Sequence, residues 1–341
     1  MPRRVLVTGG AGFVGVHLLR GLAAAGWDVV ATARRAPDAL TSAFLAPVAD
    51  RVAWLQGDVN DAPWLTAQVA GQRLDAVVHA AAVTPTAEVE RDATRLVIDT
   101  NLTATVTVLD AVRAHGVPRL LVASSTGVYA GAGDALAARH APRREDEVLE
   151  PRNLYAVCKL ASERLLDAYV EIHGLRAASL RIGSVYGPME RATRSRTGLS
   201  LVRDLVAAAA QGRHLRVSHP EVGRDLIHAH DVAAAVVALL AAPRWRWTLY
   251  NLASPVAHPV REVLDLLAAN SGLTWEASAV EDADLALTPD RHRDAVDLSR
   301  LAADAGFAPR VPLAKGLVHT LAWRRLGDDL AAAAAFPAAP A

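Results

Sequence analysis

A glycine-rich turn between the first expected strand and the first expected helix constrains this fold most. Residues 7–15 read VTGGAGFVG, in which Gly10, Gly12 and Gly15 satisfy the pattern G-x-G-x-x-G. Gly9, Gly12 and Gly15 also give the wider form T-G-x-x-G-x-x-G. Such glycines permit a tight turn, let the backbone approach a pyrophosphate and bring helix against strand. The helix N-terminus adds amide donors for phosphates, so we expect a dinucleotide site rather than a purely structural turn.

Short β-like runs alternate with helical stretches along the first half of the chain. The expected strands are rich in Val, Leu and Ala and cover residues 4–9, 27–33, 51–56, 74–81, 119–125 and 175–184. The expected helices cover residues 13–26, part of 38–48, 61–70, 100–116 and 153–171. Strands separated by helices of this length imply right-handed βαβ crossovers. We therefore expect the fold class α/β, with a doubly wound parallel sheet.

The pattern changes beyond Gly187 and Pro188, where an arginine-rich loop precedes further helices and short β runs. We expect residues 1–183 to form a dinucleotide-binding domain, to which the chain returns at about 222–256. Residues 184–221 and 257–328 are expected to form a smaller substrate-binding lobe over the carboxyl ends of the strands, where such sheets bind ligands. The alanine-rich residues 329–341 are expected to be a disordered tail.

Composition excludes several classes of function. Lys plus Arg and Asp plus Glu each total 36, so no global field favours nucleic acid or an anionic membrane. With one cysteine, Cys158, neither an intrachain disulfide nor a cysteine-built metal site is expected, and a cytoplasmic location follows most simply. The N-terminus lacks the apolar core of a signal peptide, and the apolar run 232–242 is far shorter than a membrane span. We expect binding to neither nucleic acid nor membrane.

The end of the second expected strand bears on the choice between NAD and NADP. NAD-binding turns usually place an acidic residue there to hold two ribose hydroxyls. Here Ala33 takes that position and Arg34 and Arg35 follow, so a 2′-phosphate could pair with a guanidinium. The other interpretation is a solvated arginine pair. We expect NADP, with NAD as the alternative. Asp58 is expected either to receive the adenine amino group or to cap the next helix.

Tyr155 and Lys159 lie one helical turn apart on the same face of an amphipathic segment. Moving a hydride from a secondary alcohol to a nicotinamide also requires loss of the hydroxyl proton. A free tyrosine, with a pKa of about 10, is a poor base near neutrality. A lysine one turn away, together with a positive nicotinamide, favours the phenolate. Either residue alone would more often be a packing or solvated side chain, but behind the glycine turn the pair predicts acid–base chemistry.

Five segments carry a family resemblance: TGGAGFVG from residue 8, HAAA from 79, SSTGVY from 124, YAVCK from 155 and RIGSVYGP from 181. Over about its first 320 residues the chain resembles the extended short-chain dehydrogenase/reductase family, in its NAD-dependent epimerase/dehydratase group with UDP-galactose 4-epimerase-like enzymes. The resemblance implies a Rossmann fold and a homodimer paired through the helix of Tyr155. It gives Lys159 a second role at the nicotinamide ribose and makes Ser125 the substrate-polarising hydroxyl, although Ser124 and Thr126 are neighbouring hydroxyls.

The expected site residues fall into three groups. The catalytic residues are Ser125, Tyr155 and Lys159. Cofactor contacts are expected from Gly9, Gly12, Phe13, Val14, Gly15, Arg34, Arg35, Asp58, Val59, Ala80, Ala81, Ala82, Asn101, Tyr155 and Lys159. Substrate contacts are expected from Thr84, Ser125, Thr126, Ser184, Arg191 and Arg224. Within the second group, Asn101 matches a family asparagine whose role is support or helix capping.

The substrate is less well defined by the sequence. Ser184 stands where the family's nucleotide-sugar epimerases carry an asparagine that contacts the sugar nucleotide. Arg224 matches an arginine that often binds a diphosphate, and a further late arginine is either Arg291 or Arg293. Arg191 belongs to an arginine-rich loop that either recognises a carboxylate or phosphate or is simply solvated.

Two departures from the family pattern narrow the reaction. Thr126 and Gly127 replace the acidic pair of the family's dehydratases, which disfavours elimination. An exchangeable NADP suits a dehydrogenase better than an epimerase, which retains NAD. We expect an NAD(P)-dependent oxidoreductase that transfers hydride at a secondary alcohol or ketone of a polar, sugar-like or anionic small molecule. The alternatives are a UDP-sugar 4-epimerase with retained NAD and a non-catalytic cofactor-binding protein.

A metal site is not expected. His228, His230 and Asp231 resemble metal ligands, and alternation along a strand would put both histidines on one face. The matching segment of the family binds no metal.

Overall fold

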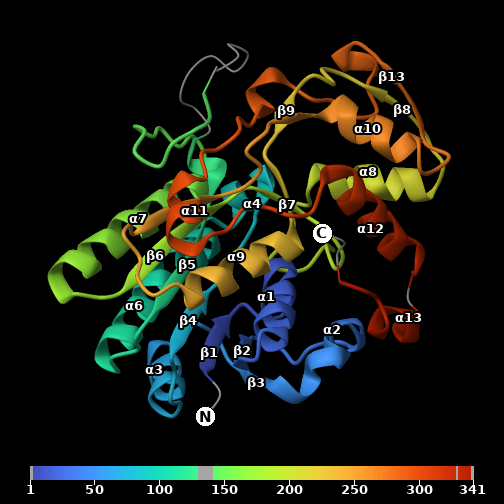
Figure 1. Cartoon of the computed structure of the whole chain (residues 1–341). Coiled ribbons are helices and arrows are strands. Elements are labelled where there is room, and N and C mark those ends of the chain that lie inside the picture. The colour runs from blue at the N-terminus through green and yellow to red at the C-terminus, as the bar shows by residue number, and fades with distance from the viewer. Residues whose placement is uncertain (1–2, 130–140, 328, 339–341) are drawn as a thin grey trace.

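The structure, a computed structural model, describes residues 3–129, 141–327 and 329–338. Its centre is a seven-stranded sheet in which all neighbouring strands are parallel (Figure 1). The strands are β1 (Arg4–Thr8), β2 (Asp28–Ala33), β3 (Val52–Gln56), β4 (Ala76–His79), β5 (Leu120–Ser125), β6 (Ala177–Ile182) and β11 (Leu249–Leu252). Helices cover both faces, which explains why the strands are runs of Val, Leu and Ala. The expected α/β fold with a doubly wound sheet is confirmed.

The order of the strands sets the place of the site. It is β11-β6-β5-β4-β1-β2-β3, so the chain builds outward from β1 and then returns to its other side with β4. Thr8, at the carboxyl end of β1, pairs with Thr32 of β2 and His79 of β4. The crevice beyond Thr8 is the point where the strand order reverses, which is where such sheets bind ligands.

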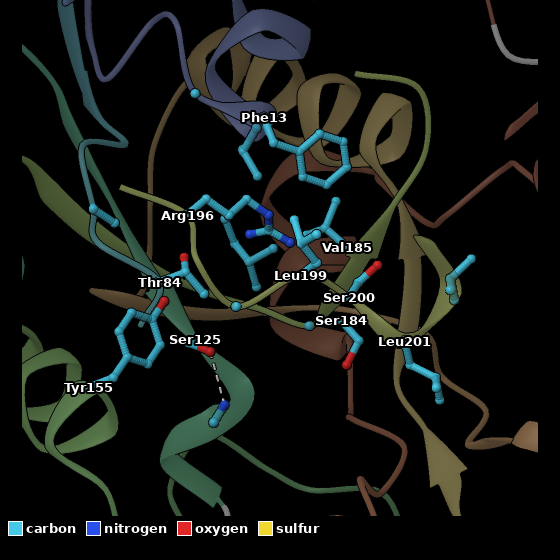
Figure 2. A pocket seen from close by; sticks show the side chains of 18 of the residues that line it. Phe13, Thr84, Ser125, Tyr155, Ser184, Val185, Arg196, Leu199, Ser200 and Leu201 are labelled. Atoms are coloured by element: carbon cyan, nitrogen blue, oxygen red, sulfur yellow. Dashed lines mark hydrogen bonds between the residues drawn. The ribbon is translucent and has the colours of Figure 1, made fainter. Parts of the chain in front are cut away.

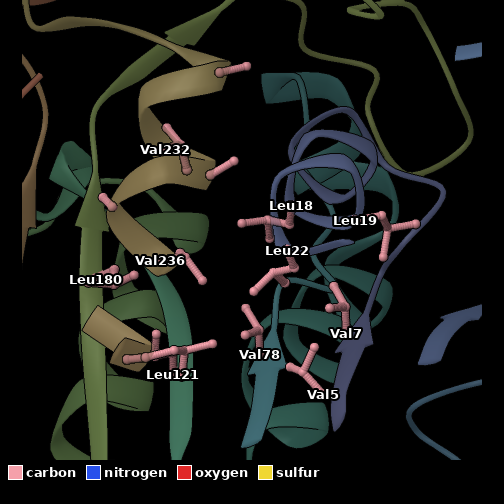
Figure 3. Close-up of a cluster of buried hydrophobic side chains, with 14 of the residues drawn as sticks. Val5, Val7, Leu18, Leu19, Leu22, Val78, Leu121, Leu180, Val232 and Val236 are labelled. Carbon is pink, nitrogen blue, oxygen red and sulfur yellow. The ribbon is translucent and has the colours of Figure 1, made fainter. Parts of the chain in front are cut away.

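Two helical layers enclose the sheet. One contains α1 (Phe13–Ala24), α2 (Ala39–Leu45), α9 (Ala229–Ala241) and α11 (Ser299–Ala305); the other contains α3 (Ala62–Ala70), α6 (Ala104–Ala114) and α7 (Leu154–His173). Alternate residues of β1 serve the two layers, since Val5 and Val7 belong to the first core and Leu6 to the second. Figure 3 shows Leu18 and Leu22 of α1 among the side chains of the first core, next to the strands.

Side-chain caps fix where several helices begin. The carboxylates of Asp38 and Asp61 accept backbone N–H groups at the starts of α2 and α3. Asn153 and Ser200 do the same for α7 and for α8 (Leu201–Ala210). Removal of such a cap typically costs about 1 kcal/mol. The cap of α7 matters most here, because that helix carries Tyr155 in its first turn.

A second hydrophobic core lies beyond the carboxyl ends of the strands (Figure 1). It packs α8, α10 (Val260–Ala268) and α12 (Leu313–Arg325) against the parallel pair β8 (His214–Val217) and β13 (Thr274–Ala277). Two more small pairs connect it to the main sheet: β7 (Ser184–Tyr186) with β10 (Leu226–His228), and β9 (Gly223–Arg224) with β12 (His258–Pro259). The domain division expected at residue 183, with a return at about 222–256, stays a prediction.

The helix expected over residues 100–116 begins with a π-helical turn, and two short helices that the sequence analysis did not predict precede it. Residues 87–103 form α4 (Ala87–Asp92), α5 (Thr94–Ile98) and a wide π-helical turn, η2 (Asp99–Thr103). Short 3-10 turns complete the fold: η1 (Ala46–Arg51), η3 (Thr126–Tyr129), η4 (Val280–Asp282) and η5 (Pro289–Arg291). None of the helices in the described ranges has the length and apolar character that a membrane crossing requires.

The expectation of a disordered tail is wrong for residues 329–338. Asp329 caps a short helix, α13 (Leu330–Ala334), and Phe336 is 7% exposed. The Phe336 ring packs against His319 and Trp323 of α12, and its carbonyl accepts a hydrogen bond of 2.7 Å from Arg20. The alanine-rich composition predicted disorder, but it did not account for the packing of the single aromatic residue, Phe336. Residues 339–341 lie outside the described residues.

Candidate active site

A cavity of about 610 Å³ lies along the carboxyl ends of β1, β4, β5 and β6 and extends to the second core. Its wall combines the glycine turn, the loop after β4, the end of β5, the first turn of α7 and the loop after Pro188 (Figure 2). This volume is typical of a site for a small molecule or cofactor. The sheet topology thus brings together segments that are far apart in the sequence.

The glycine turn has the geometry of a pyrophosphate cradle. Gly9 has φ of +71°, and a Cβ there would lie 2.7 Å from the backbone of Ala81. A Cβ on Gly15 would lie 2.1 Å from the Gly9 carbonyl oxygen. Gly12, Phe13, Val14 and Gly15 all line the cavity. Because the first N–H groups of a helix lack acceptors within it, the start of α1 fits a bound phosphate.

Buried hydrogen bonds fix the loop after β4. The Thr8 hydroxyl bonds to His79 at 2.7 Å and accepts from the Ala81 N–H at 3.2 Å. The Asn101 amide bonds to both backbone groups of Val83, at 3.2 and 3.0 Å. Ala80, Ala82 and Thr84 line the cavity as expected. Asn101 does not line it; its side chain supports the loop from behind, which favours support over direct cofactor contact.

The expected adenosine end lies outside the cavity wall. Arg34 and Arg35 are exposed just beyond β2, and within the described ranges neither guanidinium is in an ion pair. The Asp58 carboxylate accepts the Asn60 N–H at 2.9 Å, whereas Asp61 caps α3. The helix-cap interpretation of Asp58 is therefore wrong. Val59, the other expected contact beside it, is buried.

The three expected catalytic residues line the same cavity. The Lys159 ammonium donates to the Ala123 carbonyl at 2.9 Å and lies 5.7 Å from the centroid of the Tyr155 ring. Ser125 Oγ accepts a hydrogen bond of 3.1 Å from the Gly127 N–H. Figure 2 shows the hydroxyls of Tyr155 and Ser125 on the same side of the cavity. Glu90, which the sequence did not single out, accepts the Tyr155 N–H at 2.9 Å.

Burial governs the acid–base properties of this group. It raises the pKa of Tyr155, while a hydrogen bond with Ser125 and the charge of Arg196 act in the opposite direction. Burial also lowers the pKa of Lys159 to about 8, against the charges of Cys158 and Glu163. The expected lowering of the tyrosine pKa therefore does not hold for the chain alone, because desolvation of the phenolate outweighs the cations around it.

A buried ion pair beneath β5 distinguishes the neighbouring serines. Ser124 Oγ donates to Glu163 at 2.5 Å, and Arg181 holds the same carboxylate through two nitrogens, at 3.0 and 2.8 Å. Both ionic side chains are at most 2% exposed. Ser124 is therefore committed to the interior, and Ser125 provides the hydroxyl at the cavity. Glu163 lies four residues after Lys159, a spacing that could have pointed to it.

The loop after Pro188 crosses the cavity and places its arginines differently from the expectation. Arg191 lines the cavity, where it pairs with Asp38 at 2.6 Å and donates to the Thr41 hydroxyl of α2 at 3.0 Å. Arg196 instead reaches the middle of the cavity, 5.1 Å from the Phe13 ring (Figure 2). The expectation of Arg191 as a substrate contact stays a prediction: its guanidinium already bonds to Asp38 and Thr41, and Arg196 takes the central position.

Glu190 and Thr84 hold this loop in place. The Glu190 carboxylate forms an ion pair with Arg196. It also accepts two hydrogen bonds from Ser200, one from the backbone N–H at 2.8 Å and one from the hydroxyl at 2.5 Å. The Thr84 N–H donates to the Ser195 carbonyl at 2.8 Å. The loop is thus joined to both sides of the cavity.

Three arginines converge on the end of the cavity nearest the second core: Arg224, Arg291 and Arg293. Burial and the nearby Arg293 charge lower the pKa of Arg224 to about 10. Its Nε is a buried donor that finds no partner among the described residues. A buried unsatisfied donor beside two further cations fits an anionic ligand. The sequence left the choice between Arg291 and Arg293 open; both line the cavity.

A buried carboxylate joins two other expected substrate contacts. Asp225 is fully buried and accepts a hydrogen bond of 2.6 Å from Ser184 Oγ and another from Thr126 Oγ1. Both hydroxyl residues line the cavity. Asp225 was missed in the sequence, where it stands beside Arg224 at the end of a short strand.

The two histidines do not share a strand face as the alternation suggested. β10 ends at His228, and His230 lies in the first turn of α9 because the chain turns into a helix between them. The His228 ring instead accepts the His230 N–H at 3.1 Å. The described ranges contain no cluster of three or more His, Cys, Asp or Glu side chains suited to a metal ion.

Comparison with known proteins decides the family. The model of the NAD dependent epimerase/dehydratase family matches residues 5–253. The chain belongs to this family. It is therefore an enzyme of the extended short-chain dehydrogenase/reductase type, as its resemblance predicted, and the family is NAD-dependent.

The similar proteins include different reaction types within the epimerase/dehydratase family. The chain is 32% identical to a dTDP-glucose 4,6-dehydratase of Streptomyces griseus, over 99% of this chain and 100% of the relative. It is 29% identical to a GDP-6-deoxy-D-mannose reductase of Pseudomonas aeruginosa, over 93% and 95%. The structure of a Thermus thermophilus UDP-glucose 4-epimerase in complex with NAD aligns with a TM-score of 0.76 at 26% identity, covering 94% of this chain and 99% of that one.

Proposed function

We propose that this protein transfers a hydride between an exchangeable NADP and a secondary alcohol or ketone on the sugar of a nucleotide sugar. The observation that carries the proposal is that one cavity contains the Ser125, Tyr155 and Lys159 hydroxyl and amine groups and, at its far end, the arginine cluster around Arg224. One end suits proton transfer at an alcohol, and the other suits a diphosphate. Relatives named for dTDP-, GDP- and UDP-sugars support this substrate class.

The proton transfer follows from the positions of the side chains. The bound nicotinamide supplies the hydride acceptor or donor. Tyr155 takes the hydroxyl proton during oxidation and returns it during reduction. Ser125 Oγ accepts from the Gly127 N–H and also shares a hydrogen bond with Tyr155, so its proton can turn from the phenol to the reacting oxygen when substrate binds. Lys159, held by the Ala123 carbonyl, places a cation where it favours the phenolate once cofactor binds.

NADP is the proposed cofactor, because Arg34 and Arg35, which make no ion pair with the described residues, follow β2 where an NAD site would carry a carboxylate. The NAD complex of the Thermus thermophilus relative supports NAD as the alternative. An epimerase with retained NAD is the second candidate function, favoured by that same relative. A protein that only binds cofactor is the third, and the presence of all three catalytic groups weighs against it.

Dehydration is the least suited reaction despite the Streptomyces griseus relative. Thr126 occupies the place of an acidic residue and donates its proton to Asp225. No carboxylic acid therefore stands at that position to protonate a leaving hydroxyl.

The test is a turnover assay with the full chain, UDP-glucose, dTDP-glucose or GDP-mannose, and either NADP⁺ or NAD⁺. The proposal expects net reduction of NADP⁺ with at least one sugar. Inversion of the sugar without net change of a cofactor that mass spectrometry finds retained would favour the epimerase. Lack of binding of all three nucleotide sugars would contradict the substrate class.

We also propose a homodimer paired through α7, as the family resemblance implies. Val157 on α7 is 46% exposed and Leu96 on the neighbouring α5 is 38% exposed, so this face offers apolar surface to a partner. Gel filtration with light scattering tests this, and a monomer at working concentration would contradict it.

A further inference from the structure

Thr126 and Ser184 form a subsite whose hydrogen-bonding direction is fixed. Both residues line the cavity, one at the start of η3 after β5 and the other at the start of β7. Both donate to the carboxylate of Asp225, which is fully buried and has no exposure to solvent. The Ser184 N–H adds a third hydrogen bond to the same carboxylate, at 3.3 Å.

The donor and acceptor capacity of a hydroxyl determines which ligand groups this subsite can bind. A serine or threonine hydroxyl has one proton and two lone pairs, and an ionised carboxylate only accepts. Once both protons are committed to Asp225, the two oxygens can offer a ligand lone pairs only. Ser125 has a different arrangement, because its oxygen accepts from the Gly127 N–H and its proton faces Tyr155 rather than a carboxylate.

We propose that the Thr126–Ser184 subsite accepts only a hydrogen-bond donor of the substrate, a free hydroxyl or an amine or amide N–H on the sugar ring next to the reacting carbon. This inference rests on the proposed nucleotide-sugar substrate and adds to it. A ring whose group at that position is a carboxylate, a ketone, an ether or a fluorine meets two acceptors and binds poorly. The opposed polarity of Ser125 and this subsite also orients the ring, since the reacting oxygen needs the donor.

Deoxyfluoro sugars test the direction of these hydrogen bonds, because fluorine replaces a hydroxyl without supplying a proton. The probe is whichever of UDP-glucose, dTDP-glucose and GDP-mannose binds the full-length protein most tightly by calorimetry. It is compared with its analogues fluorinated singly at each hydroxyl-bearing carbon of the sugar. We expect one analogue to bind about 10-fold or more weakly, since a site built to bond a hydroxyl rejects the analogue that lacks it.

Two variants assign that loss to the subsite. The double variant Thr126→Val, Ser184→Ala should bind this analogue and its parent with similar affinity. The control Thr126→Ser keeps the hydroxyl and should keep the discrimination. Asp225→Asn gives one hydroxyl an amide donor and so frees its proton, which should reduce the discrimination. Thermal unfolding and NADP affinity establish that each variant is folded.

The outcomes separate this inference from the proposed function. If none of the three parent nucleotide sugars binds, the proposed function is wrong and this inference fails with it. If the parent binds but every fluorinated analogue binds equally well, only the donor requirement of the subsite is overturned. Discrimination that persists unchanged in the Thr126→Val, Ser184→Ala variant also overturns it.

Discussion

The Lys159 ammonium lies 5.7 Å from the centre of the Tyr155 ring, one helical turn away on α7, while its hydrogen bond goes to the Ala123 carbonyl. The ammonium therefore lies over the phenol ring, while its hydrogen bond goes to the backbone of β5. Burial raises the pKa of the same phenol, so the free enzyme holds Tyr155 protonated. An additional positive charge is needed to stabilise the phenolate form of Tyr155. A bound, positively charged nicotinamide would supply that charge.

Arg196 should shift the pH dependence of turnover. Its positive charge lowers the pKa of Tyr155, so Arg196→Met leaves that pKa higher. Oxidation, which needs the deprotonated phenol, should then require a higher pH. The measurement is kcat/KM against pH in the oxidation direction. The control is Arg194→Met, an exposed position of the same loop. An unchanged profile in the Arg196 variant would contradict the assignment.

Arg34 should discriminate between the two cofactors. Arg34→Ala removes a guanidinium that only the 2′-phosphate of NADP can engage. Hydrogen bonds to charged groups are worth about 1.5–3 kcal/mol, so NADP affinity should fall by about 10-fold or more while NAD affinity stays nearly constant. Fluorescence titration with both cofactors measures this, and Arg35→Ala shows which arginine carries the larger share. Equal losses for NADP and NAD would refute the cofactor proposal.

The Glu163–Arg181 pair should be costly to break. Both side chains are buried, and Ser124 is the carboxylate's third contact. Breaking a buried pair leaves an uncompensated charge, so Glu163→Gln should lower the free energy of unfolding by about 3 kcal/mol. The double variant Glu163→Met, Arg181→Met removes both charges and should lose less. Urea unfolding measures both, and a larger loss in the double variant would contradict this account.

Two buried histidines should make the protein sensitive to acid. Burial lowers the pKa of His17 to about 4 and that of His79 to about 3. The unfolded chain protonates both near pH 6.5, so between about pH 6.5 and 4 it binds more protons than the folded chain. The contribution of these neutral rings to the free energy of unfolding is therefore complete above pH 6.5. It decreases as the pH is lowered, by about 1.4 kcal/mol per pH unit for each extra proton that the unfolded chain binds.

His17→Gln separates this effect from other acid titrations. Glutamine does not titrate but can still donate to the Pro188 carbonyl, which His17 meets at 2.9 Å. Urea midpoints measured between pH 7 and 4 should fall less steeply in this variant. His115→Gln, at an exposed position, is the matched control. A slope identical to that of the parent in the His17 variant would show that burial does not keep this ring neutral.

The sequence was informative where spacing and backbone geometry determine the outcome. Gly9 and Gly15 could be predicted because a Cβ at either position collides with backbone. Tyr155 and Lys159 could be predicted because helical spacing puts them on one face. Arg196 and Arg191 could not be ranked, because their positions depend on Glu190 and Asp38, partners that only the folded loop brings near.

Asp225 and Glu163 show the limit more clearly. Each is a buried carboxylate whose partners lie 18 to 99 residues away along the chain, so the local pattern cannot name those partners. The family resemblance pointed to Ser125, but the residue pattern alone could not separate it from Ser124, because the difference depends on Glu163. Phe336 was missed for the same reason, since its aromatic partners are on α12.

Tyr155→Phe tests the central claim most directly, because it removes one oxygen and keeps the aromatic ring in the first turn of α7. With whichever nucleotide sugar the parent enzyme oxidises, we predict a fall in kcat of about 10²- to 10⁴-fold, the usual contribution of a positioned acid or base, with NADP affinity nearly unchanged. Turnover comparable to that of the parent enzyme would contradict the assignment of Tyr155 as the acid and base.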